Sequence, residues 1–320
     1  MTEGPAHPGP DPHWTVAEED DGVRLDKFLA GEGRLGSRGR AAGALARGKV
    51  FVNDVEATDG GGRVATGDRV RVWMDRPGSA KPRVQPGTYG ALEIVFEDSD
   101  LVVVNKPAGL LSVPLERRAA APSVYDLVDD HFRPHGKRQP LVVHRIDRDT
   151  SGLVVFAKTA HAQARLKEQF KRREPDRVYQ AVVYGHPDPP AGTWRDILVW
   201  DTTALIQKET HPHDPRGKEA ISEYRVLETF RDASLLEVRL TTGKRNQIRI
   251  QARLRGHTLV GERRYVFGPD TLRPIPFGRQ ALHAWRLTFR HPAGGRTLTF
   301  DAPLPRDFVD LLARLRPPAR

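Results

Sequence analysis

The 320-residue sequence contains no cysteine. Disulfide frameworks, cysteine-ligated zinc, iron–sulfur clusters and thiol catalysis are therefore excluded, and the chain suits a reducing compartment. No stretch stays apolar over the length that a membrane-spanning helix requires. The proline-rich first residues also lack the basic end and apolar core of a secretory signal. We therefore expect a cytoplasmic protein.

Motifs for nucleotide and metal binding are missing as well. The sequence has no GxxxxGK[ST] loop for cradling phosphates. His211 and His213 have metal-ligating side chains, but Pro212 separates them and the segment is typical of a solvated turn. We expect neither a metal nor any other cofactor.

Positive charge, by contrast, is abundant. The chain has 51 Lys and Arg against 41 Asp and Glu, a net charge of +10. Residues 33–49 hold five basic side chains and no acid, residues 165–177 hold six against three, and residues 244–264 hold seven against one, Glu262. One such stretch alone is typical of a solvated face. Three in one basic chain favour a polyanionic partner, most simply nucleic acid.

Proline, glycine and hydrophobic periodicity divide the chain into five parts. We expect a disordered tail at 1–13, a compact unit at 14–75, a linker at 76–90, a larger domain at 91–308 and a C-terminal tail at 309–320. In the compact unit, two helical stretches precede two strand-like segments, KVFVNDVEA and DRVRVWM.

Strand patterns dominate the larger domain. They run from LEIVFED to RTLTFDAP, several of them separated by gaps of hairpin length, and are interrupted by the helical stretches SVYDLVDDHF and TAHAQARLKEQFKRRE. This arrangement predicts the α+β class: a mainly antiparallel or mixed sheet with flanking helices, preceded by the small α/β unit.

The segment HRIDRDTSG, residues 144–152, places charges between two strand-like runs. In one interpretation it is a solvated loop whose carboxylates accept backbone N–H groups. In the other, Asp147 lies at the end of a buried strand, where a carboxylate needs a cationic partner to stay ionised. Arg145, Arg148 and the remote Arg249 are the candidate partners. A glycosidase pair of Asp147 and Asp149 is disfavoured by the cationic flanks.

HRIDRDTSG resembles the signature of the RluA-type pseudouridine synthases, usually His-Arg-Leu-Asp, two variable residues and Thr-Ser-Gly. Four other segments resemble the same family in the expected order, covering residues 91 to about 305: LVVVNKPAGLLSVP, LKEQFKRREPDRVYQAVVYG, TTGKRNQIRIQARLRGHTLVGERRYV and QALHAWRLTFRHP. Near the N-terminus, RLDKFLA, GKVFVND and GDRVRV resemble an S4 domain, a small RNA-binding module.

The resemblance implies a pseudouridine synthase fold and a reaction that needs no cofactor. The N1–C1′ bond of a uridine in RNA breaks, the base turns, and C5 joins C1′. Asp147 becomes the catalytic carboxylate at the sugar, as nucleophile or base. Tyr179 becomes the ring that stacks on the target base, and Arg249 the partner of Asp147, with a phosphate contact as its competing role. Arg145 either intercalates into the RNA or supports the flipped-out nucleotide.

RNA contacts follow from the same motifs. The expected RNA-binding residues are Lys106, Arg145, Arg148, Lys244, Arg245, Asn246 and Gln247 in the larger domain, and Arg38, Arg40 and Lys49 in the S4-like unit. Lys244 stands where the family usually has Arg and Asn246 where it usually has His, which puts the identity of the substrate in doubt.

We expect a monomer that acts on ribosomal RNA in preference to transfer RNA. Two non-catalytic alternatives stay open: an RNA-binding or ribosome-assembly factor that keeps the fold, and an S4-type regulator. The intact set of Asp147, Tyr179 and Arg249 favours the enzyme, because a pure binder has no need of it.

Overall fold

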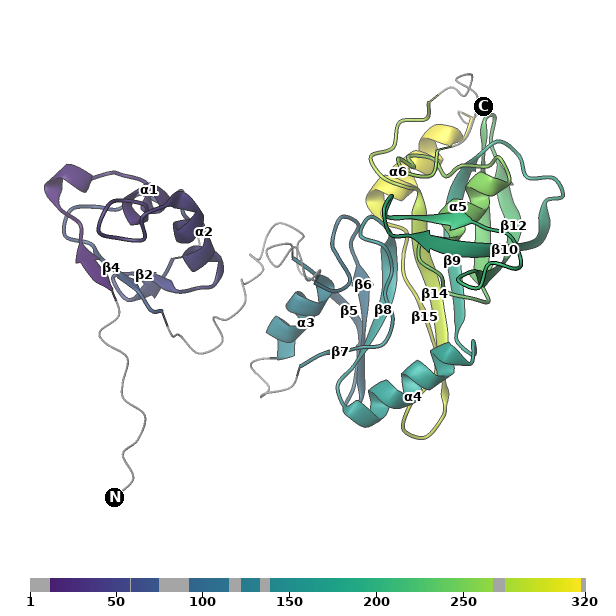
Figure 1. Cartoon of the computed structure of the whole chain (residues 1–320), viewed down its shortest axis with the longest axis horizontal. Helices are drawn as coiled ribbons and strands as arrows, with labels where there is room; N and C mark the ends of the chain where they lie inside the picture. The colour runs from purple at the N-terminus through teal and green to yellow at the C-terminus, as the bar shows by residue number, and fades with distance from the viewer. Residues whose placement is uncertain are drawn as a thin grey trace. The chain divides into compact units, whose positions relative to one another are not determined.

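A computed structural model of the chain (Figure 1) describes residues 12–57, 59–74, 92–114, 122–132, 139–266 and 274–317. The expected linker at 76–90 lies outside the described residues, as does the expected tail at 1–13 apart from its last two residues. The chain divides into two compact units, one of residues 1–90 and 114–122 and one of residues 91–113 and 123–320.

The first unit packs two helices on a four-stranded sheet with the order β1-β4-β2-β3. Its elements are β1 (His13–Thr15), η1 (Glu18–Asp20), α1 (Leu25–Leu29), α2 (Arg38–Ala46), β2 (Val50–Val52), β3 (Val55–Glu56) and β4 (Arg69–Val72). Leu25, Phe28 and Leu29 of α1 are buried in one core with Val50 and Val70 of the sheet.

KVFVNDVEA is a hairpin and not the single strand that its alternation suggested. Asn53 and Asp54 both have positive φ, 49° and 64°, and separate β2 from β3. A two-residue hairpin turn needs left-handed conformations at its central residues, and Asn and Asp tolerate them better than most side chains.

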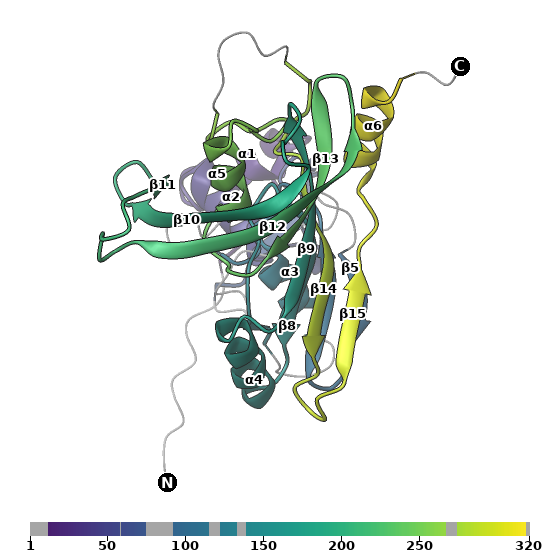
Figure 2. The ribbon, with the colours of Figure 1, turned by 90° about the vertical axis from the view of Figure 1, so that its right-hand side faces the viewer.

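The second unit is built on one large sheet flanked by helices (Figures 1 and 2). Its strands are β5 (Glu93–Glu97), β6 (Leu101–Lys106), β7 (Leu141–Val142), β8 (Ser151–Ala157), β9 (Asp176–Tyr184), β10 (Ala191–Asp201), β11 (Ile206–Glu209), β12 (Lys218–Thr229), β13 (Ala233–Leu240), β14 (Leu282–Arg290) and β15 (Thr297–Asp301). Its helices are α3 (Val124–Phe132), α4 (Ala160–Lys171), α5 (Gln247–Leu254) and α6 (Arg306–Leu315).

The predicted α+β class and mixed, mainly antiparallel sheet are confirmed. The main strand order is β11-β10-β12-β13-β9-β14-β8-β6-β5, with β15 beside β14 and β7 beside β8. Among the described strands of this sheet, only β14 and β8 pair in parallel, through His283 with Ser151 and Ala284 with Gly152. The HRIDRDTSG segment therefore ends at the point where its strand joins β14.

Gly152 is required at this junction. Its φ is +112°, and a Cβ built on it would lie 2.2 Å from the backbone oxygen of Ala284. Any other residue would force the two strand backbones apart. The glycine of the signature thus lets β8 and β14 meet directly behind the loop that carries Asp147.

Helix α4 covers one face of the sheet near β8 and β14. Its Ala162 and Leu166 are buried in a core with Leu153 and Val155 of β8 and Leu287 of β14. Thr159 caps the helix by accepting the backbone N–H of Ala162 on its side-chain oxygen. The C-terminal end of α4 thereby delivers Phe170 and Lys171 to the pocket described below.

The expected C-terminal tail at 309–320 is wrong for residues 309–315, because these residues belong to α6, which spans Arg306–Leu315. Phe308, Leu311 and Leu312 follow helical spacing and are buried in a core with Val182 of β9 and Leu235 of β13. Residues 318–320 lie outside the described residues. The helix belongs to the second unit and packs against β9, the strand that carries Tyr179.

This packing makes a stability prediction. Leu311 is fully buried, so Leu311→Ala should lower the free energy of unfolding by about 2–5 kcal/mol. Val309 on the same helix is 44% exposed, so Val309→Ala should change that free energy far less. Urea unfolding of the two variants measures both values. Equal losses would contradict the burial of one helix face.

Candidate active site

The loop between β7 and β8 opens into a pocket of about 460 Å³. Asp147 and Tyr179 line it, together with five cationic side chains, Arg145, Lys171, Arg173, Arg177 and Lys244. The volume lies within the range of ordinary ligand pockets. One carboxylate among five cations makes this a site for an anionic ligand.

The backbone of the Asp147 loop is fixed by the segment that follows β6. The hydroxyl of Ser112 donates to the oxygen of Ile146 at 2.7 Å and accepts the N–H of Ile146 at 3.1 Å. Gly109 N–H donates to the oxygen of Arg148 at 3.0 Å. Two motifs that are distant in sequence therefore form one rigid support for Asp147.

Lys106 completes this support, and its expected role in RNA binding is wrong. The side chain is fully buried. Its Nζ donates to the oxygens of Pro107, Leu110 and Arg148 at 2.9, 2.7 and 2.7 Å, which uses all three N–H groups of an ammonium. Burial lowers its pKa to about 7, against the pull of Asp149 and Asp147. No donor is left for a phosphate.

Asp147 is held by Arg249, as the sequence predicted for this pair. Nη1 of Arg249 lies 3.2 Å from Oδ2 of Asp147, and the side chains are 12% and 27% exposed. Arg249 lies on α5 and Asp147 on the β7–β8 loop. The remaining exposure of Asp147 leaves its carboxylate open to the pocket.

Glu262 anchors Arg249 from the opposite side. Its two carboxylate oxygens accept Nε and Nη2 of Arg249 at 2.6 and 2.7 Å. The Glu262 side chain is fully buried, and Oε1 also accepts the backbone N–H groups of Arg263, Arg264 and Tyr265. Burial alone would raise the pKa of Glu262, but Arg249 and these N–H groups outweigh burial and lower it.

The fork of Arg249 is thereby divided between two carboxylates. Glu262 takes one edge of the guanidinium in bidentate geometry, and only Nη1 is left for Asp147. Burial alone would lower the pKa of Arg249, but Glu262 and Asp147 together raise it above its ordinary value. Glu262 was not among the expected site residues, although it is the only acid in the basic stretch 244–264.

Asn246 contacts Arg249 and also lines the pocket. Its Oδ1 accepts from Nη1 of Arg249 at 3.2 Å, and its Nδ2 donates to the hydroxyl of Tyr265 at 2.9 Å. Its φ of 54° places it in the left-handed region at the start of α5. Asn246 thus supports the arginine, and because the half-buried side chain also lines the pocket, its expected RNA contact stays a prediction.

Tyr179 lies on β9 at the floor of the pocket. It pairs with Val238 of β13 and Ala284 of β14, so it is held from both sides of its strand. The side chain is only 8% exposed. Burial, with a smaller effect from Asp147, raises its pKa to about 12 against the opposing effect of Arg177. The hydroxyl is therefore neutral near pH 7 and suits a stacking role better than a basic one.

His144 and Phe170 form a second aromatic wall. Their rings stack at 4.7 Å, and Nε2 of His144 accepts the backbone N–H of Val155 at 3.2 Å. Burial, reinforced by Arg177, lowers the pKa of His144 to about 3. This imidazole therefore stays neutral at physiological pH and contributes shape and not charge.

The other residues of the expected RNA-binding set differ in accessibility. Arg145 is exposed and Lys244 half-buried at the pocket. Arg148 is exposed but paired with Asp149 at 3.0 Å. Arg245 lies over the ring of Trp200, 4.1 Å from its centroid. These four stay predictions.

Gln247 is a correction. It is 3% exposed, and its Nε2 donates to the oxygen of Ile221 and the hydroxyl of Ser222 at 3.0 and 2.9 Å. Its Oε1 accepts the hydroxyl of Thr242 and the N–H of Lys244. Since the amide is fully used inside the protein, the expected RNA contact is wrong.

Arg38, Arg40 and Lys49 belong to the first unit and stay predictions. Arg38 and Arg40 are exposed on the first turn of α2, where Ser37 accepts the N–H of Arg40. Lys49 is half-buried and its ammonium contacts the backbone oxygen of Met74. The two arginines therefore remain available to a partner.

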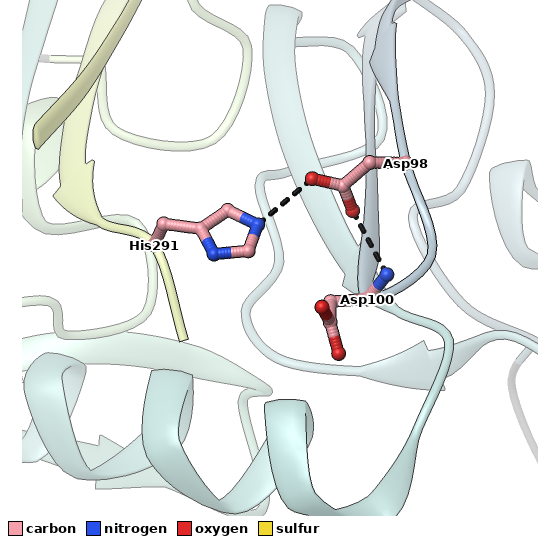
Figure 3. A group of neighbouring side chains, drawn as sticks. All are labelled: Asp98, Asp100 and His291. Atoms are coloured by element: carbon pink, nitrogen blue, oxygen red, sulfur yellow. Dashed lines mark hydrogen bonds and ion pairs between the residues drawn. The ribbon is translucent and has the colours of Figure 1, made fainter. Parts of the chain in front are cut away.

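Among the described residues, one group has the spacing of metal ligands: Asp98, Asp100 and His291. Figure 3 shows Asp98 between the other two. Its carboxylate accepts from Nε2 of His291 at 2.8 Å and from the N–H of Asp100 at 2.8 Å. Nδ1 of His291 is bonded to Ala293. These contacts join the turn after β5 to the turn after β14, and they occupy both ring nitrogens.

The geometry of the pocket suits one kind of chemistry. An oriented carboxylate can stabilise positive charge that develops at a sugar carbon, and a buried neutral ring offers a stacking surface to a base. The surrounding cations attract phosphates. A nucleotide that has left its stack would meet all three features in one cavity.

Comparisons with known proteins agree with a site for a nucleotide of RNA. A family model described as RNA pseudouridylate synthase matches residues 100–254. The chain is 36% identical over 305 residues to the uncharacterized RNA pseudouridine synthase YlyB of Bacillus subtilis, covering 94% of this chain and 97% of the relative. It is 35% identical over 315 residues to the ribosomal large subunit pseudouridine synthase D of Escherichia coli K12, covering 94% and 93%.

A solved structure shares the fold. Human RNA Pseudouridylate Synthase Domain Containing 4 matches with a TM-score of 0.57 and 23% identity, over 70% of this chain and 92% of that one. The resemblance found in the sequence is thus confirmed, and the enzyme is favoured over the non-catalytic alternatives. No helix within the described residues is long and apolar enough to cross a membrane. The chain belongs to the RluA-type family of RNA pseudouridine synthases, enzymes that convert uridine in RNA to pseudouridine.

Proposed function

We propose that this enzyme isomerises one or more uridines of ribosomal RNA, with Asp147 as the reacting carboxylate. The observation that carries the proposal is the ion pair of Asp147 with Arg249 at 3.2 Å, at the edge of a cation-lined pocket that also contains Tyr179. The relative named for the large ribosomal subunit supports ribosomal RNA as the substrate.

Asp147 acts at C1′ of the flipped uridine. As the N1–C1′ bond breaks, positive character develops at C1′, and an ionised carboxylate stabilises it whether it attacks that carbon or removes a proton from the sugar. Arg249 fixes the direction of the Asp147 carboxylate through a hydrogen bond from Nη1. Tyr179 holds the base by stacking while it turns.

The first unit adds affinity for RNA as an S4-like module. The exposed Arg38 and Arg40 on α2 support this role, because cations on an exposed helix contact phosphates without reading sequence. The catalytic unit alone then selects and converts the uridine. The protein acts as a monomer in the cytoplasm in this proposal.

A pseudouridine map of total RNA tests the proposal. Deletion of the gene should remove pseudouridine from at least one position of ribosomal RNA. The wild-type gene should restore it and Asp147→Asn should not, because the neutral amide cannot act at C1′. RNA binding by Asp147→Asn should stay within about threefold of wild type, since Asp147 repels phosphates. Restoration by the variant would exclude Asp147 as the reacting group.

Glu262 gives a second prediction. Glu262→Gln removes the charge that holds one edge of Arg249, so the arginine should turn toward Asp147 and misalign it. We expect kcat to fall by about tenfold or more with little change in KM. Glu209→Gln, an exposed residue on β11, is the matched control and should be silent. An unchanged kcat in Glu262→Gln would show that Arg249 needs no anchor.

The same variant has a defined pH dependence. Because the folded protein lowers the pKa of Glu262 below its ordinary value of 4.5, its stabilising effect is present above that pH and lost as the pH falls through the folded-state pKa. The difference in unfolding free energy between wild type and Glu262→Gln should therefore shrink on acidification. Urea unfolding at several pH values measures it. A pH-independent difference would contradict the ionised state of Glu262.

Charge reversal on α2 tests the role of the first unit. Arg38→Glu combined with Arg40→Glu should weaken RNA binding and reduce the slope of log affinity against log salt by about one per lost phosphate contact. The control is Arg231→Glu with Arg306→Glu, two highly exposed arginines of the catalytic unit. Equal effects from both pairs would mean that only net charge matters.

A further inference from the structure

Arg177 is a cation in the wall of the pocket that forms no ion pair with any residue the structure describes. It lies on β9, two residues before Tyr179, and lines the same cavity. Its Nε is buried and has no hydrogen-bond partner. Nη2 donates to the oxygens of Leu240 and Thr241 at 3.3 and 3.5 Å, longer than ordinary N–H···O bonds. Most of its five N–H groups are therefore unused.

The acid nearest in sequence, Asp176, opposes through its charge the lowering of the Arg177 pKa that burial causes, but it forms no ion pair with Arg177. Asp176 pairs with Arg239 at 3.3 Å instead. No ion pair of Arg177 is found among the described residues, although burial lowers the pKa of this guanidinium. A partly buried charge without a counterion is costly for a folded protein. Such a cation persists where a ligand supplies the missing charge.

Further cations gather at the same side of the pocket. Lys244 is half-buried, and burial together with the positive charges of Arg173 and Lys218 lowers its pKa. Glu219 is the carboxylate that acts against them on Lys244, and it is already shared between Arg195 and Arg173. The deficit of negative charge extends from Arg177 to the pocket rim.

We propose that Arg177 binds a phosphate next to the target uridine and that Lys244 and Arg173 extend this phosphate site at the rim. The inference rests on the proposed function, since it assigns the site to the nucleotide that Asp147 and Tyr179 receive. The ligand is a phosphodiester of RNA, which carries one negative charge and two free oxygens. Those oxygens match the unused N–H groups of a guanidinium.

The strand geometry fits this assignment. Residues i and i+2 of a strand point to the same face, so Arg177 and Tyr179 project into the pocket together. A base that stacks on Tyr179 places its ribose toward Asp147, and each ribose carries a phosphate on either side. Arg177 therefore holds the backbone while Tyr179 holds the base.

A purely structural role explains less. The guanidinium of Arg177 lies 5.7 Å from the centroid of Phe170, near the upper limit for a cation–π contact. That contact leaves the N–H groups of the guanidinium edge without acceptors. Gly243 offers a direct probe, because a Cβ built there would lie 2.5 Å from Nη1 of Arg177.

The experiment uses an RNA hairpin that contains the mapped uridine, with either normal linkages or a methylphosphonate 5′ or 3′ of that uridine. For wild type, one methylphosphonate should lower kcat/KM by about tenfold or more, mainly through KM, because it removes a charged acceptor. On normal RNA, Arg177→Gln should lower kcat/KM by the same factor, and the methylphosphonate should then lower the kcat/KM of this variant no further. Arg225→Gln, an exposed arginine of β12, is the control and should lose activity on the modified RNA as wild type does.

Two further measurements separate charge from folding. Gly243→Ala keeps every charge but displaces the guanidinium, so its KM should rise while its melting temperature stays near that of wild type. RNA affinity can be measured without turnover in an Asp147→Asn background. There, the effects of Arg177→Gln and of the methylphosphonate on affinity should again be non-additive.

Two results would overturn the phosphate site. In one, the losses of kcat/KM from Arg177→Gln and from the methylphosphonate multiply. In the other, neither methylphosphonate lowers the kcat/KM of wild type. If deletion of the gene removed no pseudouridine from the map of ribosomal RNA, the proposed function on which the phosphate site rests would be overturned instead.

Discussion

The buried carboxylate of Glu262 determines the geometry of the site. It is fully enclosed and satisfied by one guanidinium edge and three backbone N–H groups. Arg249 consequently has one direction, and Asp147 receives a single N–H from it. An arginine with both edges free would bind Asp147 in bidentate geometry and cover both of its oxygens. The division of the fork leaves the Asp147 carboxylate both paired and accessible, as its proposed role requires.

Lys106 performs a similar task for the backbone. Its ammonium joins the oxygens of Pro107, Leu110 and Arg148, so the turn after β6 and the Asp147 loop share one charge. Gly152 then brings β8 against β14 behind that loop. The buried Lys106 and the close packing at Gly152 together fix the loop that carries Asp147. Rigid placement of this kind is what a reaction at one sugar carbon requires.

The sequence was sufficient for the sheet class and for the pairing of Asp147 with Arg249, because the motifs that carry them are local and ordered. It did not identify Lys106 and Gln247 as internal residues. Both are polar and lie in motifs of the family, and only the fold shows which carbonyls and hydroxyls consume their donors. Composition counts charges, whereas burial depends on contacts between distant segments.

Glu262 and α6 were missed for different reasons. Glu262 was visible as the lone acid of a basic stretch, but its partner Arg249 lies 13 residues away across a helix and a turn. The apolar residues of α6, Phe308, Leu311 and Leu312, have helical spacing, but the segment was assigned to a tail because it lies near the end of the chain. Arg177 could not be singled out at all, since its lack of an anion is a property of its surroundings.

Strand β9 is hydrogen-bonded along both edges, to β13 and to β14. A strand held in this way cannot slip by one residue without turning its side chains to the other face. The spacing between the Arg177 and Tyr179 positions is therefore fixed at two residues, roughly 7 Å. With the roles proposed for these two residues, this spacing sets the distance between the bound base and the bound phosphate. Every uridine has the same distance between base and backbone, so the choice among uridines would then depend on surfaces outside the pocket.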